Sequence, residues 1–328
     1  MGKKIKKIGI MTSGGDAPGM NAAIRAVVRA CGYYNVECVG IYRGFQGLIE
    51  GDFITLTARD VNNTINRGGT ILKTARSKEF RTKEGRKKAY QQLQNAQIDA
   101  MVLIGGDGTF TGGMIFNKEF QFPSIGIPGT IDNDIFGTTS TIGFDTALNT
   151  VVEAIDKIRD TASSHNRLFF VEVMGRDAGF IALNSGVGSG AEEILIPEED
   201  LGLDRLLESL KRSKRSGKSS SIVVVAEGDK IGKNVFELAN YVEENLPEYE
   251  VRVSVLGHMQ RGGSPSCFDR VLASRLGVKS IELLLDGKSN LMVGLMNTKI
   301  ETTDFNKAVK GQHQINKELL RVSDIMSI

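Results

Sequence analysis

The chain has 328 residues, of which 41 are Lys or Arg and 39 are Asp or Glu, so its formal net charge is only +2. This balance excludes the broad field typical of nucleic-acid-binding or membrane-surface proteins, and Cys31, Cys38 and Cys267 lack the spacing of a zinc site or a disulfide framework. Because a single core rarely grows beyond about 250–300 residues, the length predicts two α/β lobes. The apolar run after the basic N-terminus is too short for a signal peptide or a membrane span, so we expect a cytoplasmic protein.

The first predicted strand, 7–12, leads through a Gly-rich turn at 13–19 into a helix from about Met20 to Cys31. Such a turn presents backbone N–H groups at the start of a helix and can bind phosphate. It is not a P-loop, because Met20 and Asn21 replace the Lys-Ser/Thr pair, and it also lacks the GxGxxG pattern. A phosphate site and a plain tight turn explain this spacing equally well.

A second apolar run, 36–42, predicts the next strand and is followed by a polar stretch up to the Gly-Gly pair at 68–69. Arg76 follows this pair among small residues, where its guanidinium can fork a nucleotide phosphate. A solvated surface arginine is the alternative. A charged helix over 83–94 then precedes the following strand.

Two acidic turns each follow a short apolar run that predicts a buried strand, at 100–104 and at 124–127. Asp107 lies in the first turn, and Asp132 and Asp134 lie in the second. Ligands of open α/β sheets bind outside the carboxyl ends of the strands, so we expect the two turns to face one ligand.

The residue types of these turns suit magnesium-assisted group transfer. Mg²⁺ prefers one or two carboxylates with phosphate oxygens and water, which Asp107 and Asp134 can supply. Asp132 and Asp134 are spaced i and i+2, so in an extended segment they point the same way, and one is left to accept a proton from an attacking hydroxyl. The alternative is that all three are turn formers that hydrogen-bond their own backbone.

Two helices are predicted in the second half of the chain. Apolar residues at helical spacing over 146–161 predict a packing helix whose Arg159 and Asp160 face away from the core. A helix over 203–210 precedes the basic run 211–218. We interpret this run as complementing the negative C-terminal end of the helix, with a nucleic-acid site as the alternative.

Three further strands, 168–173, 221–226 and 251–256, each end in a polar turn that contains glycine. A phosphorylated sugar, which is anionic and carries hydroxyls, would suit the residues of these turns. For each residue alone, an ordinary polar turn is the alternative. The candidates are three potential cations and one carboxylate: Arg176, His258, Arg261 and Glu227.

Several motifs occur in a fixed order along the chain: IGIMTSGGDAPGMN at 8–21, PGTIDND at 128–134, VEVMGR at 171–176 and GHMQRGGSP at 257–265. The GGDGT motif at 105–109 is shared with kinases of other substrates. The motifs PGTIDND, VEVMGR and GHMQRGGSP in this order are specific to one family. On these motifs, and over nearly its whole length, the chain resembles the bacterial-type family of ATP-dependent 6-phosphofructokinases.

The resemblance implies an α/β fold of two doubly wound, Rossmann-like lobes with mostly parallel sheets. Each lobe would be a three-layer α/β/α arrangement, and the second would be inserted in the first. Residues 1–142 with 258–305 would form the ATP-binding lobe. Residues 143–257 with 306–328 would form the lobe that binds fructose 6-phosphate.

The resemblance also implies roles for individual residues. Asp132 matches the general base that takes the proton from the sugar 1-hydroxyl, Thr130 would contact the transferred phosphoryl group, and Arg176 would stabilise its charge. Asp107 matches the Mg²⁺-binding acid, with Asp134 as an electrostatic assistant. The other ATP positions are Gly15, Arg76, Ser77, Gly106, Gly108 and Thr109. The other sugar-phosphate positions are Met174, Gly175, Glu227, His258 and Arg261, with Arg167 and Arg252 reaching in from a neighbouring subunit.

Arginines lent between subunits imply an oligomer, in this family usually a homotetramer with shared active sites. The resemblance further implies an effector site for ADP or phosphoenolpyruvate. This part of the pattern departs from the family, because Ser216 stands where a lysine is expected and the segment before Asn66 is one residue shorter. The matching positions are Arg25, Arg29, Arg59, Arg159, Gly190, Glu192 and Lys218.

Two alternatives share this fold. A diphosphate-dependent phosphofructokinase commonly has Asp and Lys where this chain has Gly108 and Gly129, and we expect these glycines to leave room for a nucleotide. A catalytically silent regulatory subunit tends to lose the acid-base group, whereas Asp132 is present. The sequence therefore predicts transfer of a phosphoryl group from MgATP to the 1-hydroxyl of D-fructose 6-phosphate, the committed step of glycolysis.

Overall fold

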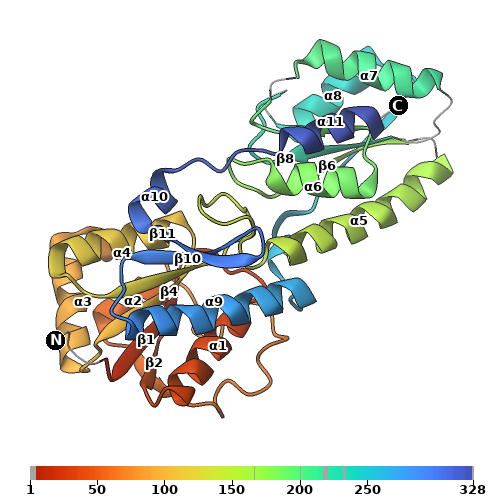
Figure 1. Cartoon of the computed structure of the whole chain (residues 1–328). Coiled ribbons are helices and arrows are strands. Elements are labelled where there is room, and N and C mark those ends of the chain that lie inside the picture. The colour runs from red at the N-terminus through yellow and green to blue at the C-terminus, as the bar shows by residue number, and fades with distance from the viewer. Residues whose placement is uncertain (1–4, 166, 200, 217–220, 232–233, 327–328) are drawn as a thin grey trace. The chain divides into compact units, whose positions relative to one another are not determined.

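The computed structural model describes residues 5–165, 167–199, 201–216, 221–231 and 234–326 (Figure 1). It divides into two compact units. Unit one combines the chain up to Ile131 with Ile135–Thr146 and Arg261–His313. Unit two combines Asp132–Asp134 with Ala147–Gln260 and the chain from Gln314 onward. Along the sequence, the second unit is therefore inserted in the first.

Unit one is built on a seven-stranded sheet. The five central strands are parallel, and the edge strands β11 and β3 pair antiparallel with their neighbours. The five parallel strands thus end at one edge, where their following turns gather. In spatial order the strands are β11 (Lys299–Asp304), β10 (Leu291–Met296), β5 (Ser124–Pro128), β4 (Ala100–Gly105), β1 (Lys7–Thr12), β2 (Glu37–Ile41) and β3 (Phe53–Leu56).

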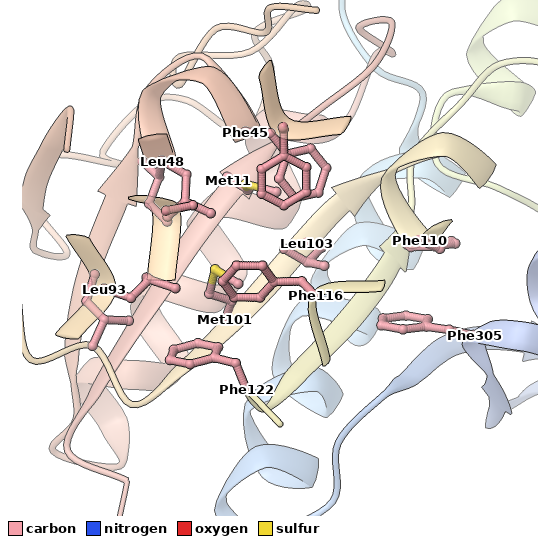
Figure 2. Close-up of a cluster of buried hydrophobic side chains, with 14 of the residues drawn as sticks. Met11, Phe45, Leu48, Leu93, Met101, Leu103, Phe110, Phe116, Phe122 and Phe305 are labelled. Atoms are coloured by element: carbon pink, nitrogen blue, oxygen red, sulfur yellow. The ribbon is translucent and has the colours of Figure 1, made fainter. Parts of the chain in front are cut away.

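Helices cover both faces of this sheet, because successive residues of each strand point to opposite sides. On one face, Met11, Met101 and Leu103 join a core of aromatic rings (Figure 2), in which Phe110 stacks on Phe305 at a centroid distance of 5.3 Å. This core lies under α2 (Gly44–Glu50), the 3₁₀ helix η1 (Glu79–Arg81), α3 (Lys83–Asn95), α4 (Asp107–Phe120) and α10 (Phe305–Lys310). On the other face, α1 (Met20–Tyr33) packs against α9 (Cys267–Leu285).

Unit two contains a four-stranded parallel sheet with the order β7 (Glu193–Leu195), β8 (Ser221–Ala226), β6 (Arg167–Val173) and β9 (Glu250–Val255). Its helices are the main part of α5 (Phe144–His165), α6 (Phe180–Ser189), α7 (Leu203–Arg215), α8 (Val235–Asn245) and α11 (Lys317–Met326), with the 3₁₀ helix η2 (Gly257–Arg261) after β9. Leu and Val residues of β6, β8, α7 and α8 form its core. Within the described ranges, no helix combines the length and the apolar character needed to cross a membrane.

Two sequence predictions about helices need correction. The helix predicted to end at Leu210 continues to Arg215, because Lys and Arg favour helix and no breaker precedes Gly217. Most of the basic run therefore lies inside the last turns of α7, where it still complements the helix dipole. Arg159 does not face away from the protein: its Nη2 donates to the carbonyl oxygens of Ser189 and Gly190, both at 2.8 Å. These carbonyls end α6 and need donors from outside that helix.

Candidate active site

Two Gly-rich turns lie side by side at the carboxyl edge of the sheet in unit one. The first is the turn at 13–19 after β1, and the second is the turn at 105–109 after β4. The backbone N–H of Ser13 donates to the carbonyl of Ile104 (2.9 Å), and the Thr109 hydroxyl donates to the carbonyl of Ser13 (3.1 Å). The first turn ends at Gly19, which has a φ of 103° that favours glycine and directly precedes α1. The structure thus brings together predicted ATP positions from both turns, namely Gly15, Gly106, Asp107, Gly108 and Thr109.

The second turn leads directly into α4, which begins at Asp107. Gly106 is the N-cap and supplies no capping side chain. The first turn of a helix favours negative charge and offers backbone donors, so this helix start suits a phosphate group. The side chain of Asp107 is exposed there, beside the exposed Gly108.

The acidic turn after β5 lies next to the start of α4. Strands β4 and β5 pair with Gly105 opposite Pro128, and the N–H of Gly129 donates to the carbonyl of Gly105 (3.0 Å). A Cβ added at Gly106 would lie 4.0 Å from the Cβ of Thr130. The pairing of two neighbouring strands therefore places Thr130 beside the helix start that carries the predicted Mg²⁺ ligand.

Thr130 and Asp132 are largely buried, with exposed fractions of 9% and 7%, although both lie in a loop. Asn133 follows in the left-handed conformation (φ 53°), which Asn tolerates better than most residues. Loops normally run over the surface because their polar groups need water. A buried polar loop at the carboxyl edge of a sheet therefore indicates a functional site more than a simple turn.

Asn21, which has no assigned role in the sequence motifs, anchors the loop that carries Arg76 and Ser77. Asn21 is 1% exposed and makes three hydrogen bonds of 2.7–3.1 Å to the backbone of residues 67–71. A buried amide with all these bonds fixes the path of the chain toward the predicted ATP residues. No local sequence pattern points to this role, because the bonded partners lie about 50 positions away along the chain.

In unit two, the turn after β6 meets the turn after β8 and the helix η2. The N–H of Arg176 donates to Glu227 Oε1 (2.7 Å), and the N–H of Met174 donates to Gln260 Oε1 (3.2 Å). Gly175 has a φ of 145°, and this conformation favours glycine. The predicted sugar positions Met174, Gly175, Arg176 and Glu227 are therefore held together by bonds to their backbone.

His258 and Arg261, the remaining sugar-phosphate positions after β9, lie at different places. His258 is exposed on η2 in unit two. Arg261 belongs to unit one, where its Nη1 donates to the carbonyl of Asp16 (3.2 Å). Its guanidinium occupies the space that a side chain at Gly15 would need. The predicted sugar-phosphate residue Arg261 thus lies against the predicted ATP turn.

Arg167 and Arg252 lie away from Arg176 within unit two. Arg167 begins β6, whereas Arg176 follows the opposite end of that strand, and a strand of seven residues spans about 20 Å. Arg252 pairs with Phe169 near the same beginning of β6. Both arginines contact Glu250, and the hydrogen bond from Arg167, with both positive charges, holds the pKa of Glu250 below its usual range.

Comparison with known proteins places this architecture in a family. The family model described as Phosphofructokinase matches residues 7–284. The chain belongs to the phosphofructokinase family. It is 53% identical over 324 residues to ATP-dependent 6-phosphofructokinase 2 of Bacteroides thetaiotaomicron, with 99% of each sequence covered. It is 55% identical over 324 residues to ATP-dependent 6-phosphofructokinase 1 of Thermus thermophilus. The alignment covers 99% of this chain and 100% of that relative.

Solved phosphofructokinase structures share the fold. The enzyme of Saccharomyces cerevisiae matches with a TM-score of 0.89 and 36% identity, and the alignment covers 98% of this chain but 48% of the yeast chain. A pyrophosphate-dependent phosphofructokinase from Marinobacter aquaeolei matches with a TM-score of 0.85 and 20% identity, over 99% of this chain and 92% of that one. The second likeness concerns the fold alone. The predicted family and the predicted fold are both confirmed.

Gly108 and Gly129 differ in what surrounds them in this phosphofructokinase. A Cβ at Gly108 would meet nothing within 4 Å. A Cβ at Gly129 would lie 3.1 Å from Ile104 Cγ2 and 3.3 Å from Met20 Cε. A side chain at Gly108 would therefore enter open space, whereas one at Gly129 would press on β4 and α1, which pack closely against the end of β5. Room for a nucleotide beside the two glycines stays a prediction.

The donor set of this phosphofructokinase fits Mg²⁺ held mainly by a substrate. Among the residues that the structure describes, no three His, Cys, Asp or Glu side chains are grouped to hold a metal ion by themselves. Mg²⁺ commonly takes one or two protein carboxylates and completes its octahedron with phosphate oxygens and water. Asp107, exposed at the start of α4, fits this requirement.

Three predicted effector positions come together in unit two of the phosphofructokinase. Arg159 of α5 donates to the carbonyl of Gly190, and its Nη1 lies 3.9 Å from Glu192 Oε1. Glu192 is itself fixed, since its Oε2 accepts from the N–H of Ile222 (2.6 Å). These contacts hold the Arg159 guanidinium at the C-terminal end of α6.

The other effector positions lie in unit one or outside the described residues. Arg25 and Arg29 are one turn apart on α1, where burial and then the charge of Arg29 lower the pKa of the Arg25 guanidinium. Arg59 is exposed in the turn after β3. Lys218 lies outside the described residues.

Proposed function

We propose that this chain is an ATP-dependent 6-phosphofructokinase. It transfers the γ-phosphoryl group of MgATP to the 1-hydroxyl of D-fructose 6-phosphate and yields fructose 1,6-bisphosphate and ADP, the committed step of glycolysis. The observation that carries this proposal is identity above 50%, over nearly the whole chain, to relatives named for this activity. The geometry supports it, because two Gly-rich turns and a buried acidic turn meet at one edge of a parallel sheet.

In this proposal ATP binds to the Gly-rich turns of unit one. The backbone of these turns and the dipole of α4 favour its phosphates. Asp107 would hold Mg²⁺, which when bound neutralises charge on the phosphates. The remaining nucleotide contacts are Gly15, Arg76, Ser77, Gly106, Gly108 and Thr109.

Asp132 takes the proton of the sugar 1-hydroxyl in the chemical step. The sugar oxygen forms a bond to the γ-phosphorus, and the bond from that phosphorus to the bridging oxygen breaks, so that ADP leaves with the bonding electrons. Thr130 contacts the phosphoryl group, Arg176 stabilises its charge and Asp134 assists electrostatically. Positioning and electrostatics dominate such transfers. The burial of Asp132 supports its role, since a sheltered base faces little competition from water.

Fructose 6-phosphate is held through its hydroxyls and its phosphate. Glu227 accepts from sugar hydroxyls while it also fixes the backbone of Arg176, which couples sugar binding to the placement of the catalytic guanidinium. Arg261 serves the sugar phosphate from its position against the turn at Gly15. The other contacts from this chain are Met174, Gly175 and His258.

Arg167 and Arg252 serve the site of a neighbouring subunit, so the active protein is an oligomer with shared active sites, and we assign it the homotetramer that is usual in the family. Their place at the beginning of β6 and β9, a strand length from Arg176, supports this assignment. Mixing Arg252→Ala subunits with Asp132→Asn subunits tests it. A hybrid pair contains one site with both lesions and one intact site, so activity should reappear on reassembly. Verified hybrids that are no more active than the separate mutants would show that Arg252 acts within its own chain.

A regulatory site for ADP or phosphoenolpyruvate is the remaining part of the proposal. It combines the Arg159, Gly190 and Glu192 cluster with Arg25, Arg29, Arg59 and Lys218. The protein is further proposed to act in the cytoplasm. Titration of ADP and phosphoenolpyruvate against wild type and Arg25→Ala would test the site, and effects of equal size on both proteins would contradict it.

A coupled assay with purified protein, fructose 6-phosphate and Mg²⁺ tests the function directly. ATP should support turnover and diphosphate should not, because Gly108 leaves open space beside the phosphates. Comparable kcat/KM for both donors would favour the diphosphate-dependent alternative. Absence of turnover with either donor would favour a silent regulatory subunit.

A further inference from the structure

Asp269 is a fully buried carboxylate on α9 that the proposed reaction does not use. Its Oδ1 accepts from the N–H of Gly143 (2.9 Å), and its Oδ2 accepts from the N–H (2.8 Å) and the hydroxyl (2.5 Å) of Thr146. Both partners lie more than 120 residues away along the chain. A buried charge with three donors from one distant segment indicates a specific positional role.

The three bonds cap the N-terminus of α5, which begins at Phe144. A helix normally receives its N-terminal cap from a Ser, Thr, Asp or Asn side chain. Gly143 carries no side chain, and its φ of 104° favours glycine, while Ala17 and Pro18 fill the space beside it. Asp269 therefore supplies from another helix the cap that this position cannot provide for itself.

The arrangement is reciprocal between α5 and α9. Ser266 caps α9 by accepting from the N–H of Asp269 (3.2 Å), and its hydroxyl donates to Asp145 Oδ2 of α5 (2.5 Å). The Thr146 hydroxyl donates to Asp269 and accepts from the N–H of Ser266 (2.9 Å). Two helix starts are thus locked to each other through buried or half-buried polar groups.

This lock lies directly at the end of the catalytic loop, which we define as residues 129–142. Three consecutive residues are fixed there. The Thr141 hydroxyl donates to the carbonyl of Thr130 (2.6 Å), the N–H of Ile142 donates to the carbonyl of Pro128 (3.0 Å), and the N–H of Gly143 donates to Asp269. Movement at Gly143 would therefore be transmitted across one residue to the clamp on Thr130, two positions from Asp132.

The middle of the catalytic loop is also attached to the sheet of unit one. The hydroxyl of Thr139 and its N–H donate to the carbonyl of Leu295 (2.9 and 2.7 Å), and the N–H of Leu295 donates to the Thr138 hydroxyl (3.1 Å). In addition to these bonds, a buried side chain from another element, Asp269 of α9, holds the end of the loop at Gly143.

We infer that Asp269 is a positioning residue of the active site, which holds the catalytic loop through Gly143 so that Thr130 and Asp132 keep their places. The inference rests on the proposed phosphoryl transfer. Asp269 touches neither substrate, so it acts on turnover through the loop and not on binding of ATP or fructose 6-phosphate.

Asp269→Asn tests this role, because it keeps the side-chain size but places an NH₂ group opposite backbone N–H donors. Misplacement of about 1 Å in a catalytic group can cost about 100-fold, so kcat should fall by about that factor while both KM values stay within about threefold. Ser280→Ala is the matched control. Ser280 is equally buried on the same helix, but its hydroxyl donates to Gly277 and it has no bond to the loop. This control should keep the kcat of the wild type.

A double-mutant cycle separates positioning from general destabilisation. In an Asp132→Asn background the base is already absent and only Thr130 remains to be positioned, so adding Asp269→Asn should lower kcat at least tenfold less than it does in the wild type. A loss of folded protein would lower activity by the same factor in both backgrounds. An unchanged kcat in folded Asp269→Asn, or equal factors in the two backgrounds, would overturn the inference.

Amide hydrogen exchange gives a readout that needs no activity. Asp269→Asn should speed exchange at Ile142 and Gly143, and Ser280→Ala should not. If the wild type does not turn over fructose 6-phosphate, the proposed function is refuted. If amide exchange is unchanged in Asp269→Asn, the role of Asp269 in holding the loop is refuted.

A second pair of variants applies if Asp269→Asn fails to fold. Thr146→Val removes the hydroxyl that bonds to Asp269 and should lower kcat, and Thr146→Ser should restore kcat. Equal kcat for these two variants would also overturn the inference.

Discussion

Stability of the protein should fall as the pH rises through the range in which Asp269 titrates. Burial of the carboxyl raises its pKa from 3.8 to about 6, and the nearby Asp145 charge adds to this shift, although the hydrogen bonds from Thr146 and Gly143 oppose it. Such a shift corresponds to roughly 3 kcal/mol between the protonated and the ionised forms.

The sign of the effect follows from proton binding. The folded state binds this proton more tightly than the unfolded state, so the stabilisation is complete below about pH 4 and is lost as the pH rises through about 6. Between pH 5 and pH 7.5 the loss amounts to about 1.4 kcal/mol. Asp269→Asn cannot titrate and lacks this loss.

Urea denaturation of wild type and Asp269→Asn across this pH range measures the effect. The free energy of unfolding of the wild type minus that of the variant should decrease by about 1.4 kcal/mol between pH 5 and pH 7.5. Other titrating groups occur in both proteins and cancel in this difference. Ser280→Ala should differ from wild type by a constant amount. A difference between wild type and Asp269→Asn that stays flat, or grows with pH, would refute the reasoning.

Three further predictions concern other parts of the molecule. Asp132→Asn should keep both KM values but lower kcat by about 10²- to 10⁴-fold in steady-state assays, and turnover within tenfold of wild type would exclude it as the base. Arg252→Ala should raise the KM for fructose 6-phosphate far more than that for ATP, and equal changes in the two would argue against a phosphate contact. Gly126→Ala should lower the free energy of unfolding by about 1–3 kcal/mol, since its Cβ would lie 2.5 Å from the Phe110 ring and 2.6 Å from the Phe305 ring. Thermal unfolding measures this effect, and a Tm of Gly126→Ala equal to that of the wild type would contradict the close packing at this position.

The strands that carry the candidate site were predictable because local pattern determines them. Apolar runs bounded by glycine predicted β1 and β8 with the observed bounds, and β4 and β5 to within one residue. The turns after these strands follow directly, so the sequence placed Asp107, Thr130 and Asp132 at the carboxyl edge of a sheet. The motifs then gave the family.

Contacts between distant segments could not be predicted in the same way. Nothing near Asp269 in the sequence indicates that its partners are Gly143 and Thr146, because this depends on how α9 packs in three dimensions. The sequence predicted this helix over 146–161, and only the observed start at Phe144, directly after Gly143, shows that its cap must come from elsewhere. Arg159 was placed on the wrong side for a similar reason: helical periodicity describes one helix and takes no account of the end of α6 beside it.

Hydrogen bonds join the two ends of the catalytic loop to each other, and this affects how the binding energy of the substrates is used. Fixing the backbone of one residue costs about 1–2 kcal/mol of conformational entropy, so ordering even the five residues from Thr130 to Asp134 at the moment of binding would consume several kcal/mol. Here the loop's own groups make the bonds between Pro128 and Ile142 and between Thr130 and Thr141, and these bonds need no substrate atom. Preorganisation of this kind leaves the contacts to ATP and sugar free to act on the transition state and not on assembling the site. We therefore expect the free protein to protect these loop amides from exchange almost as well as the substrate complex does.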